Sequence, residues 1–168
     1  MKRAIVLALM GGLLVGVLGS SVSAQPINFR AVLSGGDELL ERKTRARGVA
    51  TFRLDAEGTE LGFQLVVANT ENVFAAHIHC GVAGVNGPIG VTLFMGAPAG
   101  GPIDGVLAAG SVTAPDAGNA CGWADLADVV AAVESGNAYV NVHTNDGVDP
   151  PDTGPGDFPG GEIRGQVF

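Results

Sequence analysis

Apolar and polar residues alternate along several short segments of this chain, most regularly in residues 27–33, 50–54 and 61–67. Successive side chains of a β-strand point to opposite faces, so a period of two predicts strands with one buried face. Turn residues separate these segments, and the chain contains 27 glycines and 9 prolines. The pattern predicts an all-β fold.

Five further segments have the composition of strands: 73–80, 89–95, 106–113, 138–144 and 162–168. In one other segment the apolar residues follow helical spacing: Leu126, Val129, Val130 and Val133. Asp125 is a candidate N-cap for this helix, and Gly136 lies just past its end. We therefore expect a Greek-key β-sandwich or flattened barrel of about eight strands with one short helix.

The first 24 residues have the three-part pattern of a secretory signal peptide. Lys2 and Arg3 are followed by an uncharged apolar stretch and then by small residues that end at Ala24. We expect cleavage after Ala24, which leaves residues 25–168 as one domain; an uncleaved membrane anchor is the alternative. No later stretch is long and apolar enough to cross a bilayer. These features predict a secreted or periplasmic protein with no membrane span after cleavage.

Residues 25–168 are strongly acidic, with seven basic side chains against 17 acidic ones. Such a surface repels phosphate backbones, which argues against nucleic acid binding. Four of the basic side chains lie close together in the sequence: Arg42, Lys43, Arg45 and Arg47. This cluster either meets an acidic partner or forms the solvated end of a hairpin.

The chain has two cysteines, Cys80 and Cys121. In an oxidising compartment one disulfide is the expected outcome. Closing a loop of this length stabilises a fold by about 4 kcal/mol on the chain-entropy model. The alternative is that Cys80 is a metal ligand beside His79, but neighbouring strand residues point to opposite faces.

All three histidines lie in predicted strands. His77 and His79 are two residues apart in segment 73–80 and share one face, while His143 shares a polar face with Tyr139 and Asn141 in segment 138–144. Imidazole is the commonest transition-metal ligand near neutral pH, and three imidazoles suit copper or zinc with an open coordination position. If the two strands lie close together, His77, His79 and His143 form a candidate metal site.

The last predicted strand adds three polar residues on one face: Glu162, Arg164 and Gln166. If the three strands adjoin, these residues and Asn141 form one polar patch with the histidines. The patch is alternatively a hydrogen-bonded cluster without a metal, in which Glu162 pairs with Arg164 or with a histidine. Glu162 and a histidine could act as a general acid–base pair. No nucleophile-elbow or Ser-His-Asp pattern is present, so we predict no catalytic residue.

Residues 146–161 contain four aspartates among prolines and glycines: Asp146, Asp149, Asp152 and Asp157. Clustered carboxylates on a flexible backbone could hold Ca²⁺. The spacing does not fit an EF-hand loop, which favours an acidic, solvated loop instead.

Two long motifs resemble the two signatures of the CHRD domain, the module named after chordin. The first is residues 76–88, Ala-His-Ile-His-Cys-Gly-Val-Ala-Gly-Val-Asn-Gly-Pro, and the second is residues 137–144 followed by 160–166. The order of the motifs, the predicted helix before the second and the length also match, so the likeness covers essentially all of residues 25–168. Residues 146–159 form a longer insert than many members have. The resemblance implies an extracellular β-sandwich module, found in secreted bacterial proteins and animal chordin, with no established reaction.

The His-x-His strand and the disulfide also resemble those of copper-zinc superoxide dismutase, and the expected fold is similar to that architecture. That enzyme needs a metal-bridging ligand and more histidines than this chain supplies, so dismutase activity is not expected. We expect a monomeric, non-catalytic binding or structural module that recognises an extracellular protein or ligand without a cofactor. A copper- or zinc-binding protein is the alternative.

Overall fold

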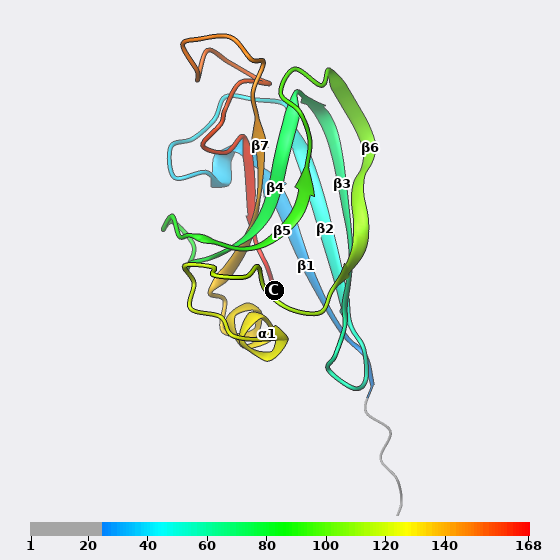
Figure 1. Cartoon of the computed structure of the whole chain (residues 1–168). Helices are drawn as coiled ribbons and strands as arrows, with labels where there is room; N and C mark the ends of the chain where they lie inside the picture. The colour runs from blue at the N-terminus through cyan, green and yellow to red at the C-terminus, as the bar shows by residue number, and fades with distance from the viewer. Residues whose placement is uncertain (1–24) are drawn as a thin grey trace, which may run out of the picture.

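The computed structural model describes residues 25–168, so the predicted signal peptide and its cleavage after Ala24 lie outside the described residues. The described chain forms eight β-strands, one α-helix and one short 3-10 helix (Figure 1). The strands are β1 (Ile27–Ser34), β2 (Arg47–Leu54), β3 (Leu61–Glu71), β4 (Val73–Cys80), β5 (Ile89–Met95), β6 (Pro102–Val112), β7 (Ala138–Thr144) and β8 (Ile163–Gln166). The helices are η1 (Gly35–Asp37) and α1 (Leu126–Glu134).

All eight strands belong to one antiparallel sheet in the order β5-β4-β7-β8-β1-β2-β3-β6. The sheet curls so that its two edge strands, β5 and β6, approach each other, which gives a nearly closed barrel (Figure 1). The predicted all-β fold of about eight strands with one short helix is confirmed, in its flattened-barrel form.

The barrel interior is filled by the residues that the alternating pattern assigned to one face. On β1 the buried residues are Phe29, Ala31 and Leu33, and their neighbours Arg30 and Val32 are exposed. β2 and β3 follow the same pattern, and the register keeps the buried faces in line: Phe29 lies opposite Phe52, which lies opposite Phe63. Burial of these side chains, at about 25 cal/mol per Å² of apolar surface, is the main stabilising contribution to the fold.

The helix α1 lies at one end of the barrel, where it packs Leu126, Val129 and Val133 against the core (Figure 1). The Asp125 side chain accepts a hydrogen bond from the Asp128 amide at 3.2 Å and so caps the helix. Gly136 follows the helix with φ 72°, the left-handed conformation in which helices commonly end. The helix and both of its predicted end signals are confirmed.

Two strands are longer than the alternation predicts. β3 continues to Glu71, and β6 begins at Pro102 rather than at Val106. Pro102 has no amide proton, but β6 is an edge strand with one free side, where proline is tolerated. The residues around Pro102 therefore form the start of a strand, although they have the composition of a turn.

Three loops cover the outer face of β4, β7 and β8. They are the β1–β2 connection (residues 35–46), the β4–β5 connection (81–88) and the β7–β8 connection (145–162). Side chains tie these loops to the strands and to each other; for example, Arg164 of β8 donates to the carbonyl oxygens of Val82 and Val85 at 3.1 and 2.8 Å. The loops therefore cover most of the polar face of the three strands and leave the histidines slightly exposed. No helix within residues 25–168 has the length and apolar character needed to cross a membrane.

Candidate metal centre

The three strands that carry the unusual polar residues are neighbours in the sheet, in the order β4-β7-β8. Across them His77 lies opposite Asn141, which lies opposite Arg164. His143 occupies the position in β7 opposite Ala75 of β4. Directly opposed residues of antiparallel strands share a face, so the register places all three histidines on the outer face of the barrel.

The three imidazoles lie next to one another in a single cluster. One ring nitrogen of each of His77, His79 and His143 lies within 4.8 Å of those of the other two. The ring centroids are 5.0 to 5.6 Å apart, and each histidine residue is only 7 or 8% exposed. Nitrogens that bind one tetrahedral ion at metal–nitrogen distances of about 2 Å lie about 3.4 Å apart, so binding a single ion would draw the three rings closer together.

Backbone carbonyl groups select the tautomer of two of the rings. His79 Nδ1 lies 3.0 Å from the carbonyl oxygen of Gly87, and His143 Nδ1 lies 3.0 Å from that of Pro159. A carbonyl oxygen only accepts, so each Nδ1 carries the proton and each Nε2 keeps its lone pair. Histidine ligands of metal ions have this same arrangement, in which the second nitrogen donates to a carbonyl or carboxylate.

Each ring also has one buried nitrogen without a hydrogen-bond partner. These atoms are His77 Nδ1, His79 Nε2 and His143 Nε2. A buried polar atom left without a partner costs about 1–3 kcal/mol, and native proteins contain few of them. Three such atoms lie in this one cluster, so the three lone pairs or N–H groups are free to interact with a further group.

Burial keeps the three imidazoles neutral, which is the form that binds metal ions. Desolvation lowers the pKa of His79 to about 4 and that of His143 to about 4, against the raising effect of their hydrogen bonds to Gly87 and Pro159. Burial also lowers the pKa of His77, and the nearby Asp116 carboxylate opposes this effect. At neutral pH the cluster therefore presents lone pairs rather than positive charge.

Tyr139 packs against the His79 ring. The sequence analysis did not predict it as a site residue. Its ring is stacked on the His79 imidazole with centroids 4.9 Å apart and an interplanar angle of 8°. The Arg164 guanidinium lies 3.4 Å from the centroid of the Tyr139 ring and also donates to Asn86 Oδ1 at 3.1 Å. These contacts hold the His79 ring and the 81–88 loop in place together. The sequence signal was the alternation that puts Tyr139 on the histidine face of β7.

Asp116 is a second residue that the sequence did not reveal. Thr92, which lies opposite His77 in β5, donates to the Asp116 carboxylate from its amide at 3.1 Å and from its hydroxyl at 2.7 Å. These bonds fix a carboxylate beside His77. Asp116 comes from the loop before α1, and no sequence spacing relates it to the histidines.

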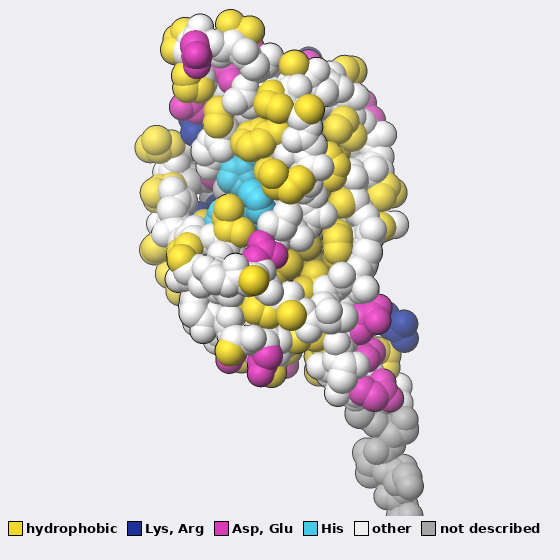
Figure 2. Space-filling model, viewed as in Figure 1, with side chains coloured by type: hydrophobic (Ala, Val, Ile, Leu, Met, Phe, Trp, Pro, Cys, Tyr) yellow, Lys and Arg dark blue, Asp and Glu magenta, His cyan; other side chains and the backbone are white. Residues whose placement is uncertain are grey.

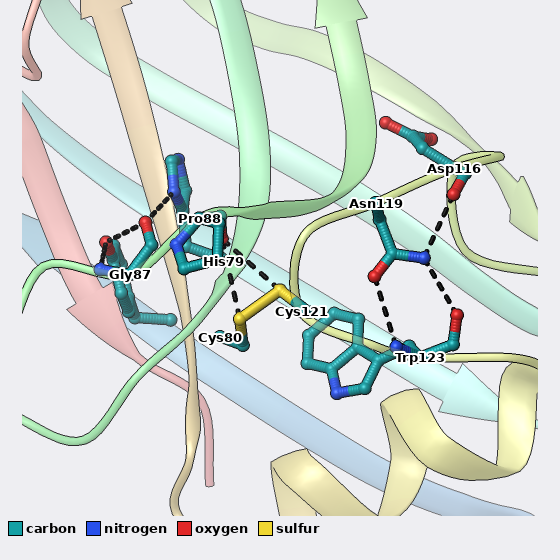
Figure 3. The surroundings of a disulfide bond; sticks show 9 residues. His79, Cys80, Gly87, Pro88, Asp116, Asn119, Cys121 and Trp123 are labelled. Carbon is teal, nitrogen blue, oxygen red and sulfur yellow. Dashed lines mark hydrogen bonds between the residues drawn. A yellow bond between two sulfur atoms is a disulfide. The ribbon is translucent and has the colours of Figure 1, made fainter.

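The disulfide between Cys80 and Cys121 is confirmed, with the two Cα atoms 5.8 Å apart. It joins the end of β4, next to His79, to the loop that carries Asp116 (Figure 3). Asn119 orders this loop, because its side chain donates to the carbonyl oxygens of Asp116 and Trp123 and accepts from the Trp123 amide. Cys80 is therefore a structural residue and not a metal ligand.

Glu162 lies next to this face, but its carboxylate bonds to neither Arg164 nor a histidine, and the predicted pairing is wrong. The carboxylate accepts from Thr44 Oγ1 at 2.5 Å, from Thr144 Oγ1 at 2.8 Å and from the Gly156 amide at 3.0 Å. Glu162 is fully buried, and it joins β7 to two of the covering loops. The reason is that the loops, whose path the strand pattern does not predict, supply two of the donors to Glu162, from Thr44 and Gly156, and β7 supplies the third from Thr144.

We expect Glu162→Ala to lower the free energy of unfolding by about 3 kcal/mol, because it leaves buried donors unpaired. Glu134→Ala, at an exposed position of α1, is the matched control and should change stability by less than about 0.5 kcal/mol. Urea denaturation of the metal-free proteins measures both. Equal stability of Glu162→Ala and wild type would contradict the assigned role.

Glu38 and Asn141 occupy the polar face beside the histidines. Burial raises the pKa of Glu38 to about 7, although Arg164, Arg42 and Asn141 each lower it. Glu38 Oε1 and Asn141 Oδ1 have no hydrogen-bond partner. Gln166 donates to the carbonyl oxygens of Gly81 and Gly136 and so ties two loop residues to β8.

The carboxylates of the acidic loop do not converge on a common point. Asp152 pairs with Arg42 at 3.2 Å, Asp146 accepts from the Val148 amide, and Asp157 accepts from the amide and hydroxyl of Thr153. Within residues 25–168 the three histidines are the group whose potential ligand atoms come together. The geometry therefore favours a nitrogen-ligated site over a calcium site.

Comparison with known proteins agrees with the first motif and with residues 137–144 of the second, and the match ends before residues 160–166. The model of the CHRD domain family matches residues 29–151. No curated protein and no solved structure matches the chain. The family match covers most of the chain and includes His77, His79, His143 and both cysteines. The chain belongs to the CHRD domain family.

Proposed function

We propose that this CHRD domain is an extracytoplasmic, non-catalytic binding module that holds one copper or zinc ion on His77, His79 and His143. The observation that carries the proposal is the convergence of three buried imidazole nitrogens that have no partner within the protein. The signal-peptide pattern of residues 1–24 and the disulfide support a place outside the cytoplasm.

A hydrogen bond between His79 and His143 does not explain why they lie together. With Nδ1 of His79 and of His143 donating to backbone carbonyls, both Nε2 atoms are acceptors, and two acceptors do not bond to each other. A metal ion of the imidazole-binding class satisfies such lone pairs together. His77 would contribute through Nδ1, its buried nitrogen without a hydrogen-bond partner.

Three protein ligands leave one position of a tetrahedral ion free for water or an exogenous ligand. The imidazoles are visible from outside the molecule, where hydrophobic side chains surround them (Figure 2). An ion can therefore reach the site from solvent, and the apolar surroundings strengthen its interaction with the nitrogen ligands.

The test is metal titration of the chelator-treated protein, residues 25–168, with Cu²⁺ and Zn²⁺. We expect one ion per chain and, at about 100 times the dissociation constant, about 2.7 kcal/mol of added stability. With Cu²⁺, electron paramagnetic resonance should show hyperfine coupling to nitrogen. The double variant His79→Ala, His143→Ala should lose both effects, whereas Gln64→Ala, on the exposed face of β3, should keep them.

Ca²⁺ is the control ion, because it prefers oxygen ligands. Stabilisation by Ca²⁺ that persists in the histidine variant would indicate binding at the acidic loop instead. If neither Cu²⁺ nor Zn²⁺ binds stoichiometrically, or if the histidine variant binds them as tightly as wild type, the proposal fails.

A further inference from the structure

Four basic side chains line a single cavity on a protein that is otherwise strongly acidic. Arg42, Lys43, Arg45 and Arg47 lie around a pocket of about 760 Å³ at the β1–β2 loop. The far wall comes from the end of β3 and the start of β6. These four are the majority of the seven basic side chains in residues 25–168. Positive charge on this molecule is therefore concentrated at one cavity.

One of the four cations, Arg42, attaches the loop to the rest of the protein. Arg42 is partly buried: it pairs with Asp152 at 3.2 Å, donates Nε to the Gly161 carbonyl at 3.3 Å and lies 4.5 Å from the Phe158 ring centroid. Thr44 and Ala46 are also turned toward the protein, whereas Lys43, Arg45 and Arg47 are exposed. Arg42 thus anchors the loop, and its three basic neighbours face solvent.

The three exposed cations have no acidic partner. The Arg42–Asp152 contact is the one ion pair between side chains that the described part of the chain forms. Arg47 donates to the carbonyl oxygens of Ala46 and Thr44, which orient its guanidinium without neutralising it. Lys43, Arg45 and Arg47 therefore keep their full charge for a ligand from outside.

The pocket lining also contains hydrogen-bond acceptors, and these narrow the ligand class. The lining includes Glu41, Glu71 and Asp104, together with Ser34, Asn69 and Thr70. Three carboxylates oppose the binding of any anion, and a ligand with hydroxyl groups offsets this repulsion because the carboxylates accept hydrogen bonds from those groups, which phosphate supplies in smaller number. A ligand that fits this lining carries both anionic groups and many hydroxyl groups.

We propose that this pocket binds an acidic oligosaccharide, in which sugar carboxylates lie against Lys43, Arg45 and Arg47 and sugar hydroxyls donate to the acidic lining. The pocket has no exposed aromatic platform, so binding depends on charge and falls with ionic strength. The site lies apart from the histidine cluster, and none of the pocket residues is a candidate metal ligand.

The experiment is calorimetric titration of residues 25–168 with tetragalacturonate, with maltotetraose as the neutral sugar and inorganic phosphate as the bare anion. We expect that tetragalacturonate binds and that the other two ligands do not. The double variant Lys43→Ala, Arg45→Ala should lower the affinity for tetragalacturonate about tenfold. Arg30→Ala, Arg53→Ala removes the same charge from exposed strand positions outside the pocket and should change affinity by less than about twofold.

Three results would overturn the proposal. Absence of tetragalacturonate binding excludes the site, and equal binding of phosphate shows a simple anion site. An equal loss of affinity in the Arg30→Ala, Arg53→Ala control shows a general effect of net charge. We expect both variants to fold, because the substituted side chains are exposed, and circular dichroism checks this.

Discussion

Metal-free protein is expected to lose several kcal/mol of stability as the pH falls from about 6.5 to about 4. Burial lowers the pKa of His79 and of His143 from 6.5 to about 4. In this window the unfolded chain binds more protons at these two histidines than the folded protein does. The stability that the neutral rings contribute is therefore complete above pH 6.5 and is lost toward pH 4. Each ring accounts for about 3 kcal/mol, at 1.36 kcal/mol per pH unit.

Urea denaturation in the presence of a chelator measures this effect across the window. The double variant His79→Gln, His143→Gln cannot titrate at these positions, so its stability should depend much less on pH.

Glu38 acts in the opposite direction. Burial raises its pKa to about 7, so its contribution to the free energy of unfolding is present below pH 4.5 and is lost as the pH rises through 7. Glu38→Gln should therefore steepen the acid loss. A flat profile in wild-type protein would contradict neutral, desolvated imidazoles.

The double variant Cys80→Ser, Cys121→Ser is expected to lower the free energy of unfolding by about 4 kcal/mol. The bond closes a chain segment of 41 residues and restricts the unfolded state accordingly. In a domain with a typical stability of about 5–15 kcal/mol, this is a large share. Chemical denaturation of the metal-free variant at neutral pH gives the difference.

Wild-type protein treated with a reductant is the matched control, because it keeps both sulfur atoms and lacks only the bond. The reduced protein and the double variant should agree within about 0.5 kcal/mol. The loop that carries Asp116 should also exchange its amide hydrogens faster in both. Full retention of stability in either sample would show that the covering loops alone order this end of the barrel.

The strands were predictable because one physical rule decides them. Phe29, Ala31 and Leu33 alternate with their neighbours and are buried, as a strand with one buried face requires, whereas Ile27 at the start of the same pattern is exposed. The sequence does not say which strands pair when they are far apart. That β7 lies between β4 and β8, and thereby joins His143 to His77 and His79, is a property of the sheet order.

The candidate site was only partly predictable. Residue type and face identified the three histidines, but their burial depends on loops that have no periodic pattern. Gly87, Pro159 and Asp116 reach the cluster through such loops, and the first two contribute backbone atoms whose positions composition does not determine. Glu162 shows the same limit: its face was assigned, but its partners Thr44 and Gly156 belong to the loops.

The acceptors that orient His79 and His143 are main-chain atoms, and this affects how the covering loops respond to mutation. Any amino acid at position 159 supplies a carbonyl oxygen, so a scan of single side-chain replacements would score much of these loops as tolerant. Gly87 is an exception, because a Cβ there would overlap the Cys80 carbonyl. Shortening or exchanging a whole loop removes the acceptor itself. A scan of single replacements would thus rank the loop as dispensable, and a loop exchange would rank the same loop as essential. The loop exchange is the experiment that measures the effect of the loop on the imidazoles.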